Sequence, residues 1–204
     1  MSVDTRIFYD VNDFARDTPW LHPIVSGYAD YGVVLFALLL IAGWWTARRD
    51  ADFARMVAAV WAPLGVLAAL AVNQPIAAAV DETRPCNALH DIVVLHCSTD
   101  AGFPSDHAVM VGAVTAGLWL VQRRLAVLAA VAAVVMAFAR VYIAAHYPQD
   151  VLAGLALGAV ISFLGFYLAR PLLARLVALA ARTPLHVLLT STGAEPAGTQ
   201  HESR

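Results

Sequence analysis

Five apolar runs dominate this sequence, and each is long enough, or nearly so, to cross the roughly 30 Å hydrocarbon layer of a membrane as a helix. The composition agrees: 60% of the 204 residues are hydrophobic and only 14% are charged, whereas about a quarter are charged in a typical soluble domain. The chain is therefore predicted to be an all-α, polytopic membrane helix bundle with one domain, residues 1–189. The apolar runs cover residues 31–47, 56–73, 108–122, 125–145 and 151–169.

The segments flanking these runs have a different character. Residues 5–28 mix aromatic and acidic side chains, which predicts an interfacial N-terminal segment rather than a cleavable signal peptide. Residues 171–189 leave two interpretations open. Arginines on one helix face favour an amphipathic helix lying on the membrane, whereas the apolar remainder is compatible with a sixth crossing. We expect five to six transmembrane helices, followed by a disordered tail over residues 190–204.

The arginines set the predicted orientation. All 13 Lys and Arg residues are arginines, and seven of them lie at the same set of helix ends. By the positive-inside rule these ends face the cytoplasm, so loop 74–104 and turn 146–149 face outward. The net charge of −2 gives no reason to expect a nucleic-acid partner. The seven residues are Arg48, Arg49, Arg55, Arg123, Arg124, Arg170 and Arg175.

Three short polar segments lie at the ends predicted to face outward. Ionisable groups near lipid are costly and are retained mainly where they pair or carry out chemistry. Arginine forks clamp phosphate oxygens, while one imidazole can attack phosphorus and another can protonate a leaving group. This combination of side chains predicts a membrane-embedded phosphatase. The segments are Arg84-Pro85, residues 103–107 with the sequence Phe-Pro-Ser-Asp-His, and Arg140 with His146 and Asp150.

The spacing of these groups indicates how they act together. A helix is expected to start at Ser105, whose first-turn N–H groups would form an anion site next to His107. Asp150 follows His146 at i+4, so its carboxylate could accept a hydrogen bond from one imidazole nitrogen and leave the other free to attack. Arg140 lies in an otherwise apolar helix, and we expect its guanidinium group to converge with that of Arg84 on one phosphate.

These segments resemble the signature of the type 2 phosphatidic acid phosphatase superfamily, and the similarity extends over about residues 5–170. The signature consists of Arg-Pro, Pro-Ser-x-His and Arg-x5-His-x3-Asp elements, which appear here at residues 84–85, 104–107 and 140–150. Glu82, Asp106 and the sequence His-Tyr-Pro-x-Asp resemble more narrowly the bacitracin-resistance branch of undecaprenyl pyrophosphate phosphatases.

The resemblance implies a role for each motif residue and no metal or other cofactor. There are two departures, because Ala77 and Ala139 stand where the superfamily has a lysine and a serine. The implied catalytic residues are His146 as the nucleophile that forms a phosphohistidine, Asp150 as its orienting group and His107 as the acid. The implied phosphate-binding residues are Arg84, Ser105 and Arg140.

The resemblance also implies a substrate and a location. The enzyme would remove the terminal phosphate of a polyprenyl (undecaprenyl or decaprenyl) pyrophosphate at the outward face of the bacterial inner membrane. This reaction recycles the lipid carrier for cell-wall peptidoglycan synthesis, with the lipid and the bilayer as partners. One alternative is a phospholipid phosphatase acting on phosphatidylglycerophosphate or phosphatidic acid. Another is a non-catalytic lipid flippase or phosphate-binding protein, which the paired nucleophile and acid argue against.

Two supporting residues allow more than one role. Asp106 could orient His107 or cap the helix that begins there. Glu82 could contact the substrate or pair with Arg84, and we favour the pairing.

The outward loop holds the only two cysteines, Cys86 and Cys97. Because oxidation is normal outside the cytoplasm, we predict a disulfide between them. Together with His90 and His96 they could in principle ligate zinc, but the spacing matches no compact zinc site.

Overall fold

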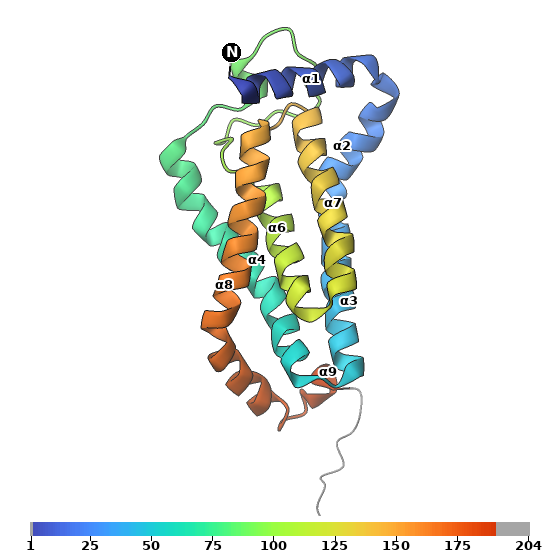
Figure 1. Cartoon of the computed structure of the whole chain (residues 1–204), viewed down its shortest axis with the longest axis vertical. Coiled ribbons are helices and arrows are strands. Elements are labelled where there is room, and N and C mark those ends of the chain that lie inside the picture. Colours follow the sequence, from blue (N-terminus) through green and yellow to red (C-terminus); the bar gives the residue numbers. More distant parts are fainter. Residues whose placement is uncertain (1, 191–204) are drawn as a thin grey trace, which may run out of the picture.

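The computed structural model describes residues 2–190, in which the regular elements are all helices and there are no strands (Figure 1). The predicted all-α bundle is confirmed. Apart from Thr190, the predicted disordered tail lies outside the described residues. Five helices run side by side to form the bundle: α3 (Val33–Asp50), α4 (Phe53–Val80), α6 (Asp106–Val121), α7 (Arg123–Tyr142) and α8 (Pro148–Ala180).

The bundle helices differ in whether they are long and apolar enough to cross a membrane. Helices α4, α7 and α8 are each long and apolar enough to cross a membrane. Helix α3 forms a fourth candidate together with the preceding 3-10 turn (Pro19–Leu21) and α2 (His22–Tyr31), with a bend of 48° between the two parts. Helix α6 has only 16 residues, a rise of about 24 Å, and packs against α4, α7 and α8 in the middle of the bundle. An apolar helix of this length suits a central position.

Glycines bring the backbones of α6 and α8 into direct contact. A Cβ atom added to Gly158 would collide with the carbonyl group of Val109, and one added to Gly112 would collide with that of Leu155. At Gly154 an added Cβ would lie 2.7 Å from the Ser105 carbonyl oxygen. Small residues are enriched where membrane helices approach this closely. The contact sets the position of Ser105 relative to the start of α8.

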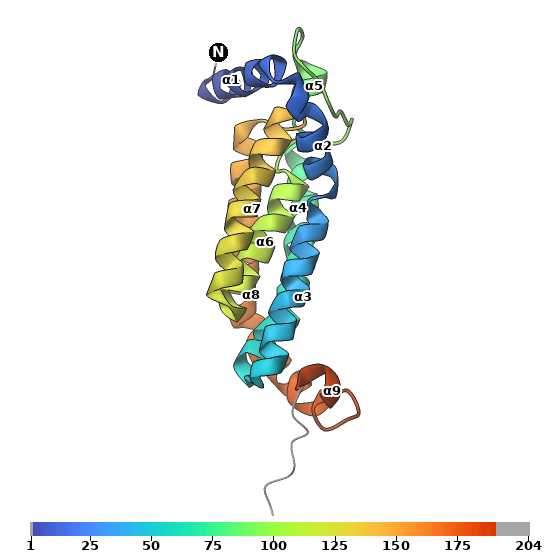
Figure 2. The ribbon, with the colours of Figure 1, turned by 90° about the vertical axis from the view of Figure 1, so that its right-hand side faces the viewer.

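Helix α1 (Val3–Asp17) lies across one end of the bundle (Figures 1 and 2). Its buried Asn12 exchanges two hydrogen bonds with the backbone of Val93, at 2.8 and 2.9 Å. Arg16 also donates to the Asp91 carbonyl, at 2.6 Å. Helix α1 therefore covers the loop that leads to the motif residues and holds it in place.

The segment lying across the bundle is shorter than the residues 5–28 predicted to be interfacial. Pro19 and Pro23 occupy first-turn positions of two new helical segments, which proline favours because its φ angle is preset for a helix start. The chain therefore turns after Thr18, and α2 runs along α7 toward α3 (Figure 1).

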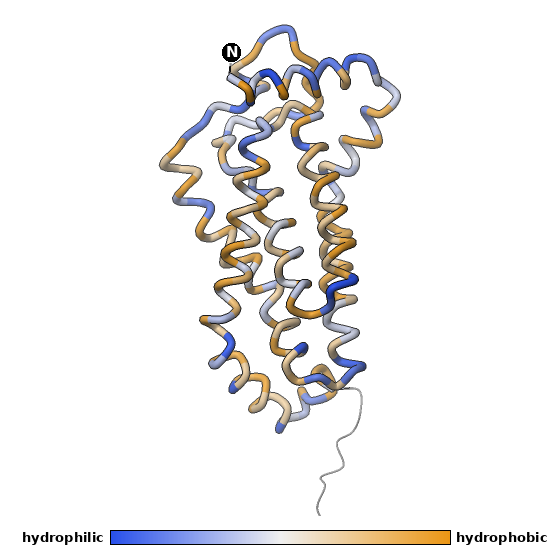
Figure 3. The backbone as a smooth tube through the Cα atoms, in the orientation of Figure 1, coloured by the Kyte–Doolittle hydropathy of each residue, from blue (hydrophilic) through white to orange (hydrophobic). Residues whose placement is uncertain are grey.

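The C-terminal segment forms no sixth bundle helix within residues 2–190. Helix α8 continues through Pro171 to Ala180, and the short α9 (His186–Leu189) folds back onto α3. Trp44 and Arg48 on α3 donate to the carbonyl groups of Leu188 and Val187, at 3.0 and 2.8 Å. Residues 171–180, the first part of the segment expected to lie on the membrane, continue α8. Figure 3 shows polar residues gathered at the two ends of the bundle and apolar residues between them.

The α6–α8 contact predicts a large effect of a single methyl group. We expect Gly158→Ala to lower the free energy of unfolding by roughly 1–3 kcal/mol, because overpacking forces the backbones apart. Thermal unfolding of the purified protein in detergent measures the change. Gly27→Ala in α2 is the control, since nothing lies within 4 Å of its added Cβ. Equal melting temperatures for the two variants would contradict the packing argument.

Candidate functional site

The predicted site residues come together at the end of the bundle beneath α1. Arg84 precedes the short helix α5 (Pro85–Ala88), and Ser105 is the N-cap of α6, as predicted. Arg140 lies in the last turn of α7, His146 in the following turn and Asp150 in the first turn of α8. All five are buried, with exposures between 0% and 7%. Charged side chains this deeply buried need compensating partners.

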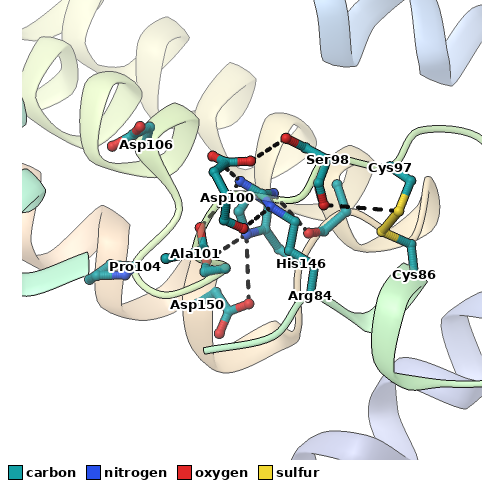
Figure 4. A network of polar contacts seen from close by, with 12 residues as sticks. Arg84, Cys86, Cys97, Ser98, Asp100, Ala101, Pro104, Asp106, His146 and Asp150 are labelled. Atoms are coloured by element: carbon teal, nitrogen blue, oxygen red, sulfur yellow. Dashed lines mark hydrogen bonds and ion pairs between the residues drawn. A yellow bond between two sulfur atoms is a disulfide. The ribbon is translucent and has the colours of Figure 1, made fainter. Parts of the chain in front are cut away.

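All three nitrogen atoms of the Arg84 guanidinium group make hydrogen bonds to the surrounding protein (Figure 4). Its Nε donates to the Asp100 carbonyl at 3.1 Å, and its Nη2 donates to the Asp100 carboxylate at 2.9 Å and to the Ala101 carbonyl at 3.3 Å. Its Nη1 donates to the Ala145 carbonyl at 3.0 Å and lies 2.8 Å from His146 Nε2. The five donors of the guanidinium are thus satisfied by the protein itself.

The hydrogen bonds of His146 determine its tautomer. Because Arg84 can only donate, Nε2 of His146 accepts. The proton is then on Nδ1, which donates to the Gly102 carbonyl at 2.8 Å. Asp150 Oδ2 lies 3.6 Å from Nδ1, beyond hydrogen-bond distance, and accepts instead from the Tyr147 N–H at 2.7 Å. The direct Asp150–imidazole hydrogen bond expected from the i+4 spacing is therefore wrong: Gly102 orients the ring and Asp150 acts on it through space.

Burial, together with the positive charges of Arg84 and Arg140, lowers the pKa of His146 to about 3. An imidazole with so low a pKa is neutral at physiological pH. Its Nε2 atom therefore keeps the lone pair that a nucleophile needs.

Three buried polar atoms in the site have no hydrogen-bond partner among residues 2–190. Two are donors, the Nε atom of Arg140 and the hydroxyl of Ser105, and the third is the acceptor Oδ1 of Asp150. No carboxylate of the described residues lies within ion-pair distance of Arg140. His107 is close enough to Arg140 and His146 for their charges to interact. A buried guanidinium and a buried hydroxyl that both lack partners are the donors an anion would satisfy.

Asp100 is a residue of the site that sequence reasoning missed, as is Gly102. Its carboxylate pairs with Arg84 and accepts a short hydrogen bond from the Ser98 hydroxyl (Figure 4). Burial alone would raise its pKa, but the hydrogen bonds from Ser98 and Arg84 outweigh this effect and hold the pKa of Asp100 below its ordinary value. The only signal in the sequence is an acidic residue in the loop before the Pro-Ser-Asp-His element.

The expected pairing of Glu82 with Arg84 is wrong. The Glu82 carboxylate accepts from the side-chain amide of Gln149 at 3.0 Å, at the start of α8. Burial and the nearby negative charge of Asp150 raise the pKa of Glu82. Asp100 takes the place next to Arg84 that the sequence reasoning assigned to Glu82.

Asp106 has neither of its expected partners. Its carboxylate accepts from the side-chain amides of Asn73 and Gln74 on α4, at 2.7 and 3.2 Å. Figure 4 shows it on the opposite side of the loop from the cluster around His146. Asp106 therefore ties α4 to the start of α6 and contacts the active groups only indirectly.

A disulfide joins Cys86 and Cys97, with their Cα atoms 5.7 Å apart. Neither sulfur is then available as a zinc thiolate. The ring it closes begins two residues after Arg84 and ends three residues before Asp100. Asn87, within the ring, donates to the carbonyl of Ser98, the first residue after it, at 2.7 Å. This covalent link keeps the two members of the Arg84–Asp100 pair opposite each other.

A cavity of about 290 Å³ lies beside this ion pair. Arg84 and Asp100 form part of its wall, and His146 is not among its lining residues. The ion pair therefore separates the cavity from the imidazole. Ala77 also lines the cavity, so the lysine of the resembled signature is replaced by a methyl group and open space. The remaining lining residues are Gln74, Ala78, Asp81, Ala101, Pro104 and Asp106.

The low pKa of His146 predicts a loss of stability in acid. In the unfolded chain a histidine has a pKa of about 6.5, so the unfolded state takes up the proton first. Stability due to neutral His146 is therefore complete above this value and is lost as the pH falls toward about 3. We expect the melting temperature to fall between pH 7 and pH 5, and to fall less in His146→Gln. An equal fall in the two proteins would rule out His146 as its source.

Comparisons with known proteins are consistent with this geometry. The PAP2 superfamily matches residues 58–173, a range that contains all the motif residues. The chain is 27% identical to undecaprenyl-diphosphatase BcrC of Bacillus subtilis (strain 168) over 161 residues, which are 79% of this chain and 81% of the relative. It is 40% identical to an undecaprenyl-diphosphatase of Sulfolobus acidocaldarius over 86 residues, 41% of each chain.

Two solved structures share the fold. LpxE of Aquifex aeolicus superposes with a TM-score of 0.67 at 19% identity, covering 82% of this chain and 96% of the other. A PAP2-type phosphatidylglycerolphosphate phosphatase of Bacillus subtilis superposes with a TM-score of 0.59 at 22% identity, covering 81% and 87%. The helix arrangement described above is thus similar to that of solved membrane proteins.

Proposed function

Because the chain belongs to the PAP2 superfamily of membrane phosphatases, we propose that it removes the terminal phosphate of a polyprenyl pyrophosphate. The site would face outward from the bacterial inner membrane, and the reaction would return the lipid carrier to cell-wall synthesis. Support for this substrate comes from relatives named as undecaprenyl-diphosphatases, one of them aligned over 79% of the chain.

The observation that carries the proposal is the buried Arg140 without an acidic partner. Its exposure is 4%, and no carboxylate of residues 2–190 lies within ion-pair distance. Desolvating one charge costs several kcal/mol unless an opposite charge meets it. The unpartnered Ser105 hydroxyl and the first N–H groups of α6 lie in the same site. Together they form a cradle for an anion with several oxygens, such as phosphate.

The proposed chemistry has two steps. In the first, Nε2 of His146 forms a bond to phosphorus, and the bond from phosphorus to the leaving oxygen breaks as His107 protonates that oxygen. The Gly102 carbonyl and Asp150 stabilise the charge that develops on the imidazole. In the second step His107 takes a proton from water, which attacks the phosphohistidine and releases phosphate. Arg84 and Arg140 stabilise the phosphoryl oxygens throughout.

Before the first step, phosphate must exchange with groups of the protein. The Asp100 carboxylate is hydrogen-bonded to the guanidinium group of Arg84. Arg84 in turn donates to Nε2 of His146, so the lone pair needed for attack is engaged. A phosphate with two negative charges competes well against one carboxylate for the same guanidinium. When Asp100 leaves, Arg84 can turn toward the phosphate and free Nε2. Asp100 would return after the reaction and help to expel the inorganic phosphate.

Phosphate release from purified protein tests the proposed substrate. We expect faster release from C50 or C55 polyprenyl pyrophosphate than from phosphatidylglycerophosphate or phosphatidic acid in the same detergent. Faster release from either phospholipid would favour the alternative of a phospholipid phosphatase. Binding of all these lipids without any release would indicate a non-catalytic role.

Replacement of the histidines tests their separate roles. We expect His146→Ala to lower the rate at least about a thousandfold on every substrate, because a covalent nucleophile is lost. His107→Ala should cost much less on p-nitrophenyl phosphate, whose leaving group needs little protonation. His90→Ala is the control, since this exposed loop histidine lies outside the site. More than a tenth of wild-type activity in His146→Ala, or equal losses on both substrates in His107→Ala, would contradict these assignments.

The Asp100–Arg84 pair predicts a change in product inhibition. We expect Asp100→Asn to bind inorganic phosphate up to about fivefold more tightly, which corresponds to the roughly 1 kcal/mol of a partly exposed ion pair. The side chain of Asp100 is 62% exposed. Inhibition constants for phosphate and orthovanadate give the measurement. Asp81→Asn removes a carboxylate from the same cavity wall without removing an Arg84 partner. An equal gain in phosphate affinity in Asp81→Asn and Asp100→Asn would show a general charge effect. It would contradict competition between Asp100 and phosphate for the Arg84 guanidinium.

A further inference from the structure

A second hollow lies at the opposite end of the bundle from the site. A single residue, Gln122, links α6 to α7 there, and a cavity of about 590 Å³ opens beside this tight connection. The cavity is lined by cationic side chains and aromatic rings and contains no residue of the phosphatase site. The cationic and aromatic lining residues are Arg55, Arg123, Arg124, Trp119, Phe163 and Tyr167.

Positive charge in this cavity is not balanced by the protein. Arg55 is paired with Asp50 at 2.6 Å and Asp52 at 3.5 Å, but neither Arg123 nor Arg124 has an ion pair within residues 2–190. Both arginines lie in the first turn of α7, where the helix dipole already places positive charge and no side chain caps the N–H groups. An anion at this position would relieve the repulsion and bind the free donors.

The cavity continues into an apolar groove. A hollow of about 430 Å³ shares Trp119 and Phe163 with the cavity and extends between α6 and α8. Ala116 and Ala159 leave room along it, and the only hydroxyl, on Thr115, donates within its own helix to the Val111 carbonyl. This part of the surface lies between two apolar helices of the bundle and is lined almost entirely by apolar side chains, so it suits an apolar occupant.

We propose that the cavity and groove together bind one anionic glycerophospholipid from the leaflet at the arginine-rich end. The phosphate lies between Arg123 and Arg124 at the start of α7, and an acyl chain lies in the groove. The guanidinium group of Arg123, 5.6 Å from the centroid of the Trp119 ring, is held where it meets the headgroup. The buried Oε1 atom of Gln122 has no partner among the described residues. It is the acceptor for a hydroxyl of a glycerol headgroup.

Fluorescence of the protein in lipid nanodiscs tests this site. Trp119 lines both the cavity and the groove, so phosphatidylglycerol with brominated chains should quench it more than brominated phosphatidylcholine does. A variant lacking the other four tryptophans isolates the signal. Native mass spectrometry of the detergent-purified protein gives an independent count of retained lipid. We expect retention of phosphatidylglycerol over phosphatidylcholine, with a stoichiometry of one at the tight site.

Paired variants separate a specific site from general attraction to an anionic surface. We expect Arg123→Gln with Arg124→Gln to weaken phosphatidylglycerol binding by roughly fivefold per arginine, the factor for about 1 kcal/mol per basic residue at an anionic lipid surface. Arg170→Gln with Arg175→Gln removes the same charge from the same end outside the cavity and should leave tight binding unchanged. Ala159→Leu keeps the arginines, fills the groove and should also abolish tight binding.

Three results would overturn the proposal. They are equal losses in the two arginine pairs, equal retention of the two lipids by the wild-type protein, and normal binding in Ala159→Leu. Helix content and melting temperature measured on each variant separate lost binding from lost folding. Because the readout is lipid binding, it does not depend on the substrate of the phosphatase site.

Discussion

The guanidinium group of Arg84 joins segments of the chain that are far apart in the sequence. It holds the loop at Asp100 and Ala101, the turn at Ala145 and the Nε2 atom of His146. The Ala145 carbonyl and the His146 nitrogen would otherwise be polar atoms buried at the end of an apolar bundle, which is costly. These hydrogen bonds form before any substrate is present, and they keep His146, the proposed nucleophile, neutral and its Nε2 atom covered. In the proposed mechanism, phosphate binding and the uncovering of Nε2 therefore both depend on the Arg84 side chain.

The helices beneath this cluster determine where its members lie. The glycine contacts between α6 and α8 allow the Ser105 N–H to donate to the Asp150 carbonyl at 3.1 Å. The start of α6, where we propose that phosphate binds, is thereby fixed against the start of α8, next to the turn that holds His146. Above the cluster, α1 and the Cys86–Cys97 disulfide hold the loop that supplies Asp100 and Gly102. Bundle packing thus positions one half of the site, and the outer loop positions the other.

The two ends of the bundle handle positive charge differently. At the phosphatase end Arg84 is neutralised by Asp100, and Arg140 is buried without an acidic partner in the described chain. At the opposite end Arg123 and Arg124 are exposed beside an aromatic cavity. A buried unpaired cation suits a small, multiply charged anion such as phosphate, because burial makes the interaction strong. An exposed cationic cavity that continues into an apolar groove suits a resident lipid instead.

Much of this protein follows from the sequence alone. The apolar runs predict the bundle because backbone groups in lipid must be satisfied within helices. The Arg84, Ser105 and Arg140 elements were recognisable by residue type and spacing, and the structure places them at one end of the bundle.

Local spacing was misleading only where a side chain had competing partners. Asp150 is four residues from His146, yet it caps the start of α8, and Gly102 orients the ring. Glu82 and Asp106 bond to amides of other helices. Asp100 and Gly102 became visible only in the tertiary structure, because a loop carboxylate and a backbone carbonyl gain their roles from where the folded loop lies and carry no periodic signal in the sequence.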